Sequence, residues 1–173
     1  WFSAPQRTGT ERPQHLDPSA LATPSLAISC AAREALHQAD VVETMLRGIL
    51  PVLRDNDLGL AERLRQMDDQ VDALYTAIKL YLTQVSRQEL EAAESKRWAD
   101  IMQFTINMEH VGDIIERMLI DVAEKKIQRG LSFSEAGMAE IEELHARLLG
   151  KARIERHAGR LQQDQRQIRR IER

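Results

Sequence analysis

Apolar and small residues recur at alternating steps of three and four along much of this chain, and this spacing constrains the fold more than any other feature. The longest such stripe consists of Trp98, Ile101, Thr105, Met108, Gly112, Ile115, Leu119 and Val122. Alternating steps of this kind form a heptad seam, which is typical of a helix that packs lengthwise against other helices. The chain is therefore expected to be all-α.

Two more stripes of the same kind precede it: Ala32, Ala35, Ala39, Val42, Leu46, Ile49 and Leu53, then Leu60, Leu64, Met67, Val71, Leu74, Ile78 and Tyr81. Thr23-Pro24 predicts the start of the first helix, and Asp55-Asn56-Asp57 predicts its end. Ser86-Arg87-Gln88-Glu89 has the form of a capping box that would begin the third helix. That helix is expected to end at Lys125-Lys126, before Gly130. Short connections make consecutive helices antiparallel neighbours, so we expect an antiparallel three-helix bundle.

The segments on either side of this bundle follow different patterns. Residues 1–22 hold three of the five prolines and no periodicity, which predicts an extended linker. Ser132-Phe133-Ser134-Glu135 has the form of another capping box, and a fourth helical pattern follows it at Met138, Ile141, Leu144 and Leu148. Over residues 149–173 the stripe thins to Ile154, Leu161, Ile168 and Ile171. We expect a helical tail that packs on a second copy of the domain or is a fragment of a second repeat.

Charge and composition exclude several classes of function. Residues 1–150 hold 16 Lys and Arg against 24 Asp and Glu, whereas residues 151–173 hold 8 against 3. An acidic body does not suit nucleic-acid binding, because phosphate affinity needs clustered positive charge. The single Cys30 excludes an internal disulfide framework and is typical of a reducing compartment. No run of 18 apolar residues occurs, so no membrane-spanning helix is expected. Because the chain opens on Trp1 without a signal-peptide pattern, we expect a piece of a longer protein.

Four carboxylates occupy matched positions on the second and third helices. Asp68 and Glu109 fall at heptad position e, and Asp72 and Asp113 fall at position b. Because e faces e across an antiparallel pair, Asp68 and Glu109 are expected to converge, with the other two widening the same acidic face. Like charges four residues apart destabilise a helix by about 0.2–0.5 kcal/mol. A hard cation, which prefers oxygen ligands, would relieve that repulsion.

Gly112 lies on the seam beside this acidic face. Glycine within a helix costs about 1 kcal/mol relative to alanine. We therefore expect another backbone to pack unusually close to it. Asp69 is expected to be solvated surface, whereas Asp40 and Glu43 on the first helix occupy positions b and e and could join the site. The alternative for all of these residues is an ordinary solvated acidic face.

Three motifs in the chain resemble the PhoU family. They are Ala35-Leu36-His37-Gln38-Ala39-Asp40-Val41-Val42-Glu43-Thr44-Met45-Leu46, Asp68-x-x-Val71-Asp72, and Met108-Glu109-His110-Val111-Gly112-Asp113. The resemblance spans about residues 23–148 and implies a PhoU-like three-helix repeat. It implies a role in phosphate homeostasis, with the acidic-x-x-x-Asp motifs as ligands of a metal ion, iron or zinc.

The segment from His15 to Pro24 resembles the one that joins the membrane domain of sodium/phosphate cotransporters to a C-terminal PhoU-like domain. This implies a cytosolic regulatory domain on the cytoplasmic side of the cell membrane. Its partners would be a transporter membrane domain, in the same or a partner polypeptide, and a second copy in a homodimer. Neither nucleic acid nor direct membrane insertion is expected. Two departures stand out: His110 replaces the Arg of many relatives, and a complete second metal motif is absent after residue 148.

Two rival interpretations belong to other classes. A ferritin-like di-metal protein needs Glu-x-x-His on two helices, a spacing found at Glu34-Ala35-Leu36-His37 and Glu142-Glu143-Leu144-His145. Their heptad positions, c and f on the first helix and b and e on the fourth, predict that these side chains do not reach the core. The other rival is a metal-free bundle that serves structure or dimerisation. Because no Ser-His-Asp set, phosphate-cradling loop or nucleotide fingerprint occurs, we do not expect an enzyme.

Overall fold

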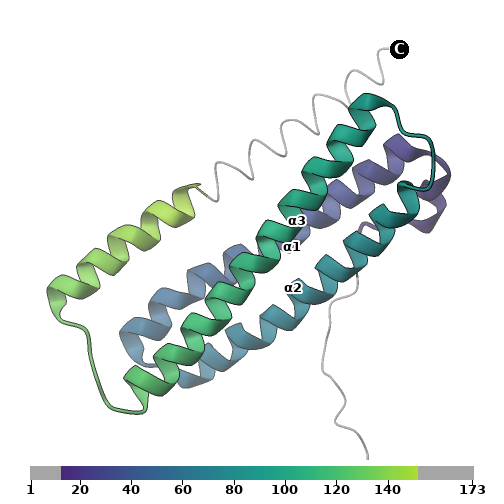
Figure 1. The fold of residues 1–173 in the computed structure, drawn as a ribbon. Helices are drawn as coiled ribbons and strands as arrows, with labels where there is room; N and C mark the ends of the chain where they lie inside the picture. Colours follow the sequence, from purple (N-terminus) through teal and green to yellow (C-terminus); the bar gives the residue numbers. More distant parts are fainter. Residues whose placement is uncertain (1–12, 152–173) are drawn as a thin grey trace, which may run out of the picture.

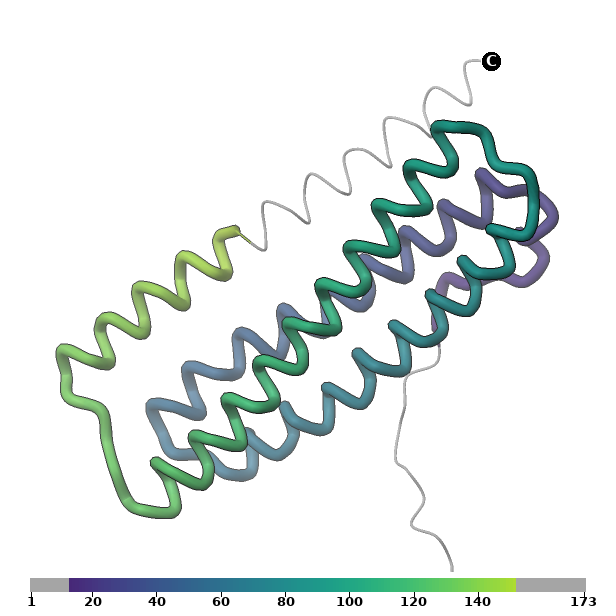
Figure 2. Tube along the Cα trace, in the orientation of Figure 1, coloured from purple at the N-terminus to yellow at the C-terminus, as the bar shows by residue number. Residues whose placement is uncertain are grey.

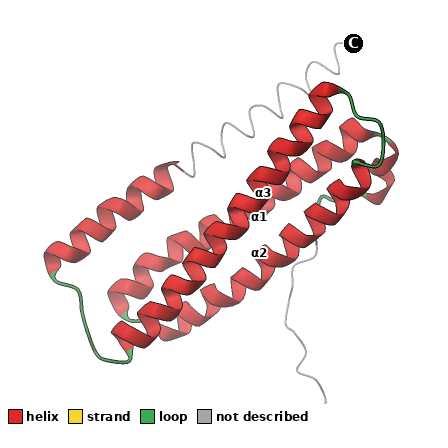
Figure 3. Ribbon diagram, in the orientation of Figure 1, coloured by secondary structure: helices red, strands yellow, loops and turns green. Residues whose placement is uncertain are grey.

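Three long antiparallel helices lie side by side, and a shorter helix runs along their outside (Figure 1 and Figure 3). This computed structural model describes residues 13–151. The long helices are α1 (Pro24–Asp55), α2 (Leu58–Val85) and α3 (Ala92–Asp121). A 3-10 helix, Pro18–Ala22, precedes α1, and a π-helix, Val122–Ile127, continues α3. The shorter C-terminal helix begins at residue 135. The predicted all-α bundle with an additional C-terminal helical unit is confirmed, while most of the predicted tail, residues 152–173, lies outside the described part.

The helix ends follow local signals, with two exceptions. Thr23 is the N-cap of α1, and the Asp57 carboxylate accepts a 2.8 Å bond from the Leu60 N–H at the start of α2. The capping box of α3 is formed by Glu91 and Glu94, so its predicted place at Ser86 is wrong. Ser86 instead ends α2, because its hydroxyl donates back to the Thr83 carbonyl at 2.9 Å and is not available to cap a new helix.

The second predicted capping box also shifts along the chain. Ser134, rather than Ser132, accepts a 3.1 Å bond from the Gly137 N–H and so begins the C-terminal helix. Gly130 has the positive φ of 64° that a left-handed stop requires, as predicted.

Two apolar clusters fill the bundle, and a polar layer lies between them. The N-terminal halves of α1 and α3 and the C-terminal half of α2 form one cluster around Ile28, Ile78, Leu82 and Ile101. The other cluster contains Met45, Val52, Leu74, Ile115 and Leu119. Glu34, Gln38 and Thr105 are fully buried polar residues. The interior is thus not a continuous hydrocarbon seam.

The polar layer explains why the predicted register of α1 is partly wrong. The predicted Ala35, Val42, Ile49 and Leu53 are buried. The predicted Ala32, Ala39 and Leu46 lie only at the edge of the core, and their predecessors Ala31, Gln38 and Met45 take the central positions. Since Glu34 and Gln38 are polar, a stripe defined by apolar residues passes beside the true buried face.

Residues 13–22, here called the N-terminal segment, pack against the end of the bundle, where the α2–α3 connection also lies (Figure 2). The sequence predicted an extended conformation, whereas Pro18–Ala22 form a 3-10 helix whose Asp17 carboxylate accepts the Ser19 N–H at 2.8 Å. Ala20 is only 2% exposed. Burial of small and apolar side chains therefore folds this segment onto the bundle.

The π-helix after α3 places a buried lysine at the end of α1. Lys126 donates to the Leu53 carbonyl at 2.9 Å and to the Asn56 side chain, and its ammonium lies 5.2 Å from the centre of the Phe133 ring. The carbonyls at a helix C-terminus lack partners within the helix, so Lys126 caps α1. The sequence predicted that Lys125-Lys126 would stabilise the end of their own helix, whereas in the structure Lys126 caps the neighbouring helix α1.

The C-terminal helix packs on α1 along one side. Met138 and Ile141 contact the second apolar cluster, and His145 Nε2 donates to the Leu46 carbonyl at 2.8 Å. Leu144 and Leu148 on its other side are exposed. No helix in residues 13–151 is both long and apolar enough to cross a membrane.

Candidate metal centre

Gly112 on α3 makes room for a carboxylate of α2. A Cβ atom at this position would lie 2.5 Å from Asp68 Oδ1 and 3.3 Å from Val71 Cγ1. The expected close neighbour of Gly112 is therefore a side chain and not another backbone. Asp68 fills that space and is 7% exposed, although it is charged by type. The missing side chain of Gly112 is what allows the acid to lie inside the α2–α3 contact.

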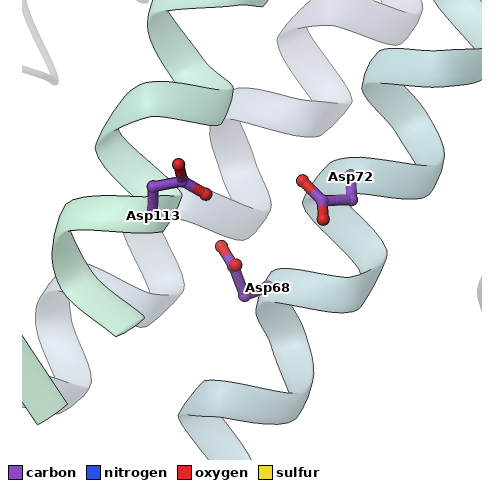
Figure 4. Close-up of side chains that lie close together, drawn as sticks. All are labelled: Asp68, Asp72 and Asp113. Carbon is purple, nitrogen blue, oxygen red and sulfur yellow. The ribbon is translucent and has the colours of Figure 1, made fainter. Parts of the chain in front are cut away.

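Two further carboxylates face Asp68. Asp72 lies one turn along α2, and Asp113 follows Gly112 on α3. One oxygen of each of the three carboxylates lies within 4.8 Å of the others, and Figure 4 shows the three groups facing one another from the two helices. Within residues 13–151 this is the single group of three or more His, Cys, Asp or Glu side chains with that geometry.

The three carboxylates are an electrostatically unfavourable group. Asp68 Oδ1 is buried and has no hydrogen-bond partner among the described residues. Burial, followed by the charges of Asp72, Glu116, Asp113 and Asp69, raises the pKa of Asp68 to about 7. Burial and the neighbouring carboxylates, Asp113 first, also raise the pKa of Asp72. An unpaired buried oxygen costs about 1–3 kcal/mol, so the arrangement is destabilising without a positive partner.

The group fits a metal cation on three separate counts. An orphaned, buried carboxylate oxygen points to a missing positive partner. The space beside Gly112 lets that oxygen approach α3. The donor set is all oxygen, which is the chemistry that hard cations prefer. Asp72 is exposed and the Asp113 side chain is 38% exposed, so an ion can enter from solvent.

The other predicted ligands lie outside the group of three. Glu109 is 23% exposed, lies 3.5 Å from His110 and contributes to the raised pKa of Asp72. Glu43 forms an ion pair with Arg47, and its Oε1 accepts from Arg47 Nε at 3.0 Å. Asp40 on α1 likewise does not belong to the group.

Glu116 is the acidic neighbour that the sequence analysis missed. It raises the pKa of both Asp68 and Asp72, and it forms a 3.9 Å ion pair with Arg65. The sequence could have indicated Glu116, because it follows Glu109 by seven residues and so shares its heptad position.

The Glu-x-x-His pairs occupy two unrelated places. The prediction that Glu34 lies outside the core is wrong: it is fully buried, and its Oε1 lies 2.9 Å from His37 Nδ1. Its other oxygen accepts the His15 N–H. Glu142 pairs with Arg54, while His145 bonds to the α1 backbone. The two pairs therefore do not converge as a ferritin-like di-metal centre requires.

The chain is similar in sequence to known proteins across most of its length. It is 43% identical over 143 residues to a protein of Salmonella typhimurium described as "Putative inorganic phosphate export protein YjbB". Proteins of the same description in Escherichia coli K12 and Shigella flexneri are 41% identical over 143 residues. These alignments cover 83% of this chain and 26% of each relative, so the chain spans about a quarter of their length.

No solved structure matches the chain. Residues 36–122, about half of it, match the PhoU domain, and this region contains α2, α3 and all three clustered carboxylates. The similarity and the helical bundle agree on one assignment: the chain belongs to the PhoU domain family.

Proposed function

We propose that this PhoU domain binds a metal ion through Asp68, Asp72 and Asp113 and regulates a phosphate transporter. One observation carries the metal proposal: a buried Asp68 oxygen without a hydrogen-bond partner lies in the space left by Gly112 and faces two more carboxylates. A bound cation supplies the positive charge that offsets the three carboxylates. Asp68 anchors the ion from inside, whereas Asp72 and Asp113 hold it from the solvent side.

The residue types narrow the identity of the ion. Three carboxylates without histidine or cysteine favour a hard ion, such as manganese or iron, over zinc, which more often takes nitrogen and sulfur ligands. Glu109 and Glu116 lie outside the group of three and increase its negative potential. We assign them the role of attracting the cation rather than holding it.

The link to phosphate transport is supported by the relatives. They are described as phosphate export proteins, and this chain corresponds to a quarter of their length. We propose that the domain acts on a membrane transporter domain, in the same or a partner polypeptide, from the cytoplasmic side of the membrane. The N-terminal segment would join the two parts. The domain itself would be regulatory, because three carboxylates without a nucleophile or a separate base make a binding site and not a catalytic one.

Metal content of matched variants tests this proposal. The chain is dialysed against Mn²⁺ or Fe²⁺, and the bound metal is measured by elemental analysis for the native protein, Asp68→Asn and Asp69→Asn. Asp69 is the exposed neighbour, so its variant loses the same formal charge without touching the group of three. We expect stoichiometric metal in the native protein and the Asp69 variant, and loss in the Asp68 variant. Equal metal content in both variants would refute the assignment, and a native protein that binds no metal would favour the metal-free structural module.

A further inference from the structure

A buried carboxylate fixes the N-terminal segment to α1. Glu34 is fully buried, and both of its oxygens are used: Oε2 accepts the His15 N–H at 2.5 Å and Oε1 lies 2.9 Å from His37 Nδ1. Two more bundle residues bind main-chain carbonyls of the segment. Tyr81 donates to Asp17 at 2.7 Å, and Gln88 donates to Leu21 at 2.6 Å. Because these bonds go to the backbone, the bundle determines where the segment lies.

Gln38 lies one turn beyond Glu34 on α1 and spans the other two helices. Its side chain is fully buried, and its amide donates to the Val71 carbonyl of α2 at 3.5 Å and to the Thr105 carbonyl of α3 at 3.3 Å. Both distances exceed the usual range of about 2.7–3.2 Å. One α1 side chain therefore holds α2 and α3 together through two long bonds.

Val71 connects this amide with the carboxylate group. It lies between Asp68 and Asp72 in the sequence of α2, and its side chain borders the space beside Gly112 on α3. Neighbouring ligand oxygens on an octahedral ion with bonds of about 2.1 Å lie about 3 Å apart, whereas the carboxylate oxygens here are grouped more loosely, within 4.8 Å of one another. A shared ion would draw α2 toward α3 at this level. The Gln38 bonds would then shorten.

We propose that Gln38 couples metal binding at the carboxylate group to the strength with which the bundle binds the N-terminal segment. This inference depends on the proposed metal site and states how metal binding there would affect the N-terminal segment. Metal binding draws α2 and α3 together, and the shorter Gln38 hydrogen bonds then fix α1 more rigidly against both helices. Glu34, one turn away on α1, is held in place as a result and binds the segment more strongly. The segment leads toward the part of the protein that we assign to the transporter.

Hydrogen exchange of the full chain tests the coupling, with Mn²⁺ as the probe. The readout is the exchange rate of the segment amides, above all the His15 N–H that Glu34 binds. In the native protein, saturating Mn²⁺ should slow this exchange by at least about five-fold, the lower end of typical coupling between sites. Gln38→Leu should still bind Mn²⁺ but show no slowing.

Thr105→Val is the matched control. It changes a fully buried residue of the same layer, but Gln38 bonds to the Thr105 main-chain carbonyl, which the variant keeps. This variant should respond to Mn²⁺ like the native protein. Slowing in Gln38→Leu equal to the native value would overturn the role of Gln38. Absence of slowing in a native protein that binds Mn²⁺ would overturn the coupling itself, and absence of Mn²⁺ binding would overturn the metal site on which it depends.

Coupling between two sites is reciprocal, which gives a second, independent test. Glu34→Leu removes the oxygen that accepts the His15 N–H but leaves the three carboxylates intact. Its Mn²⁺ affinity, measured by titration calorimetry, should fall several-fold, whereas in the Gln38→Leu background the same change should leave the affinity unaltered. An unchanged affinity after Glu34→Leu alone would contradict the proposal.

Discussion

Replacing Gly112 by alanine should separate stability from metal binding. The new Cβ would lie 2.5 Å from Asp68 Oδ1 and 3.3 Å from Val71 Cγ1. The Asp68 carboxylate can move toward solvent, which frees an oxygen that has no partner in its buried position. Val71 needs to shift only slightly. Because alanine favours a helix over glycine by about 1 kcal/mol, we expect the metal-free variant to be as stable as the native protein or up to about 1 kcal/mol more stable.

Metal affinity should change in the opposite direction. With Asp68 displaced, one of three ligands is lost, and we expect Mn²⁺ affinity to fall at least about tenfold, or about 1.4 kcal/mol. Urea unfolding in a chelator and titration calorimetry measure the two quantities. A loss of stability of about 1–3 kcal/mol, as overpacking produces, would show instead that Gly112 serves helix packing and that Asp68 cannot move out of the contact.

Gly48→Ala is the contrasting control. Its Cβ would lie 2.6 Å from both terminal methyl carbons of Leu64, which is 3% exposed. That side chain belongs to the apolar core and cannot move into solvent without losing its burial. We therefore expect Gly48→Ala to destabilise the protein and to leave metal affinity unchanged, the reverse of Gly112→Ala.

Two further predictions concern stability. Because burial and nearby carboxylates raise the pKa of Asp68 from 3.8 to about 7, its protonated form stabilises the fold fully below about pH 4, and that contribution is lost as the pH rises through about 7. The full shift corresponds to about 4 kcal/mol, which partial solvent screening reduces to on the order of 2 kcal/mol. In a chelator, Asp68→Asn should therefore match the native protein near pH 4 and exceed its unfolding free energy by that reduced amount above pH 8, and a difference in unfolding free energy that stays constant across this range would contradict the shift. Lys126→Met should lower the unfolding free energy by about 1–3 kcal/mol, since it leaves the Leu53 carbonyl and Asn56 without their donor, whereas Lys125→Met, at an exposed ion pair with Asp121, should change it by less than about 0.5 kcal/mol.

Local signals made the fold predictable from the sequence. Thr23-Pro24 lies at the start of α1, the Asp57 carboxylate caps the start of α2, and Gly130 has the left-handed conformation of a helix stop. The capping box at Ser86 failed because two overlapping signals competed there. The hydroxyl of Ser86 closes α2, and Glu91 and Glu94 begin α3.

Contacts between segments of the chain determine which face of α1 is buried, and apolar spacing does not reveal them. The buried face of α1 includes Glu34 and Gln38, whose polar groups find partners only in other segments of the chain. Apolar spacing alone therefore placed the predicted seam of α1 one residue away from the buried residues at several positions.

The candidate site was only partly predicted, and the missing part again depended on contacts between helices. Equal heptad letters paired Asp68 with Glu109, but the actual register sets Asp68 against Gly112 and brings Asp113 into the group. That register depends on how α2 slides along α3, which no single helix encodes. Gly112 did indicate a close approach, and only the structure shows that a carboxylate makes it.

A crystal of the native chain grown with Mn²⁺ would show whether the three carboxylates hold a metal ion, because anomalous scattering locates the ion itself. We expect an anomalous peak within bonding distance of oxygens of Asp68, Asp72 and Asp113. The same crystal form of Asp68→Asn should lack it. A peak at another place in the bundle, or none at saturating Mn²⁺ with these three carboxylates ordered, would contradict the metal centre.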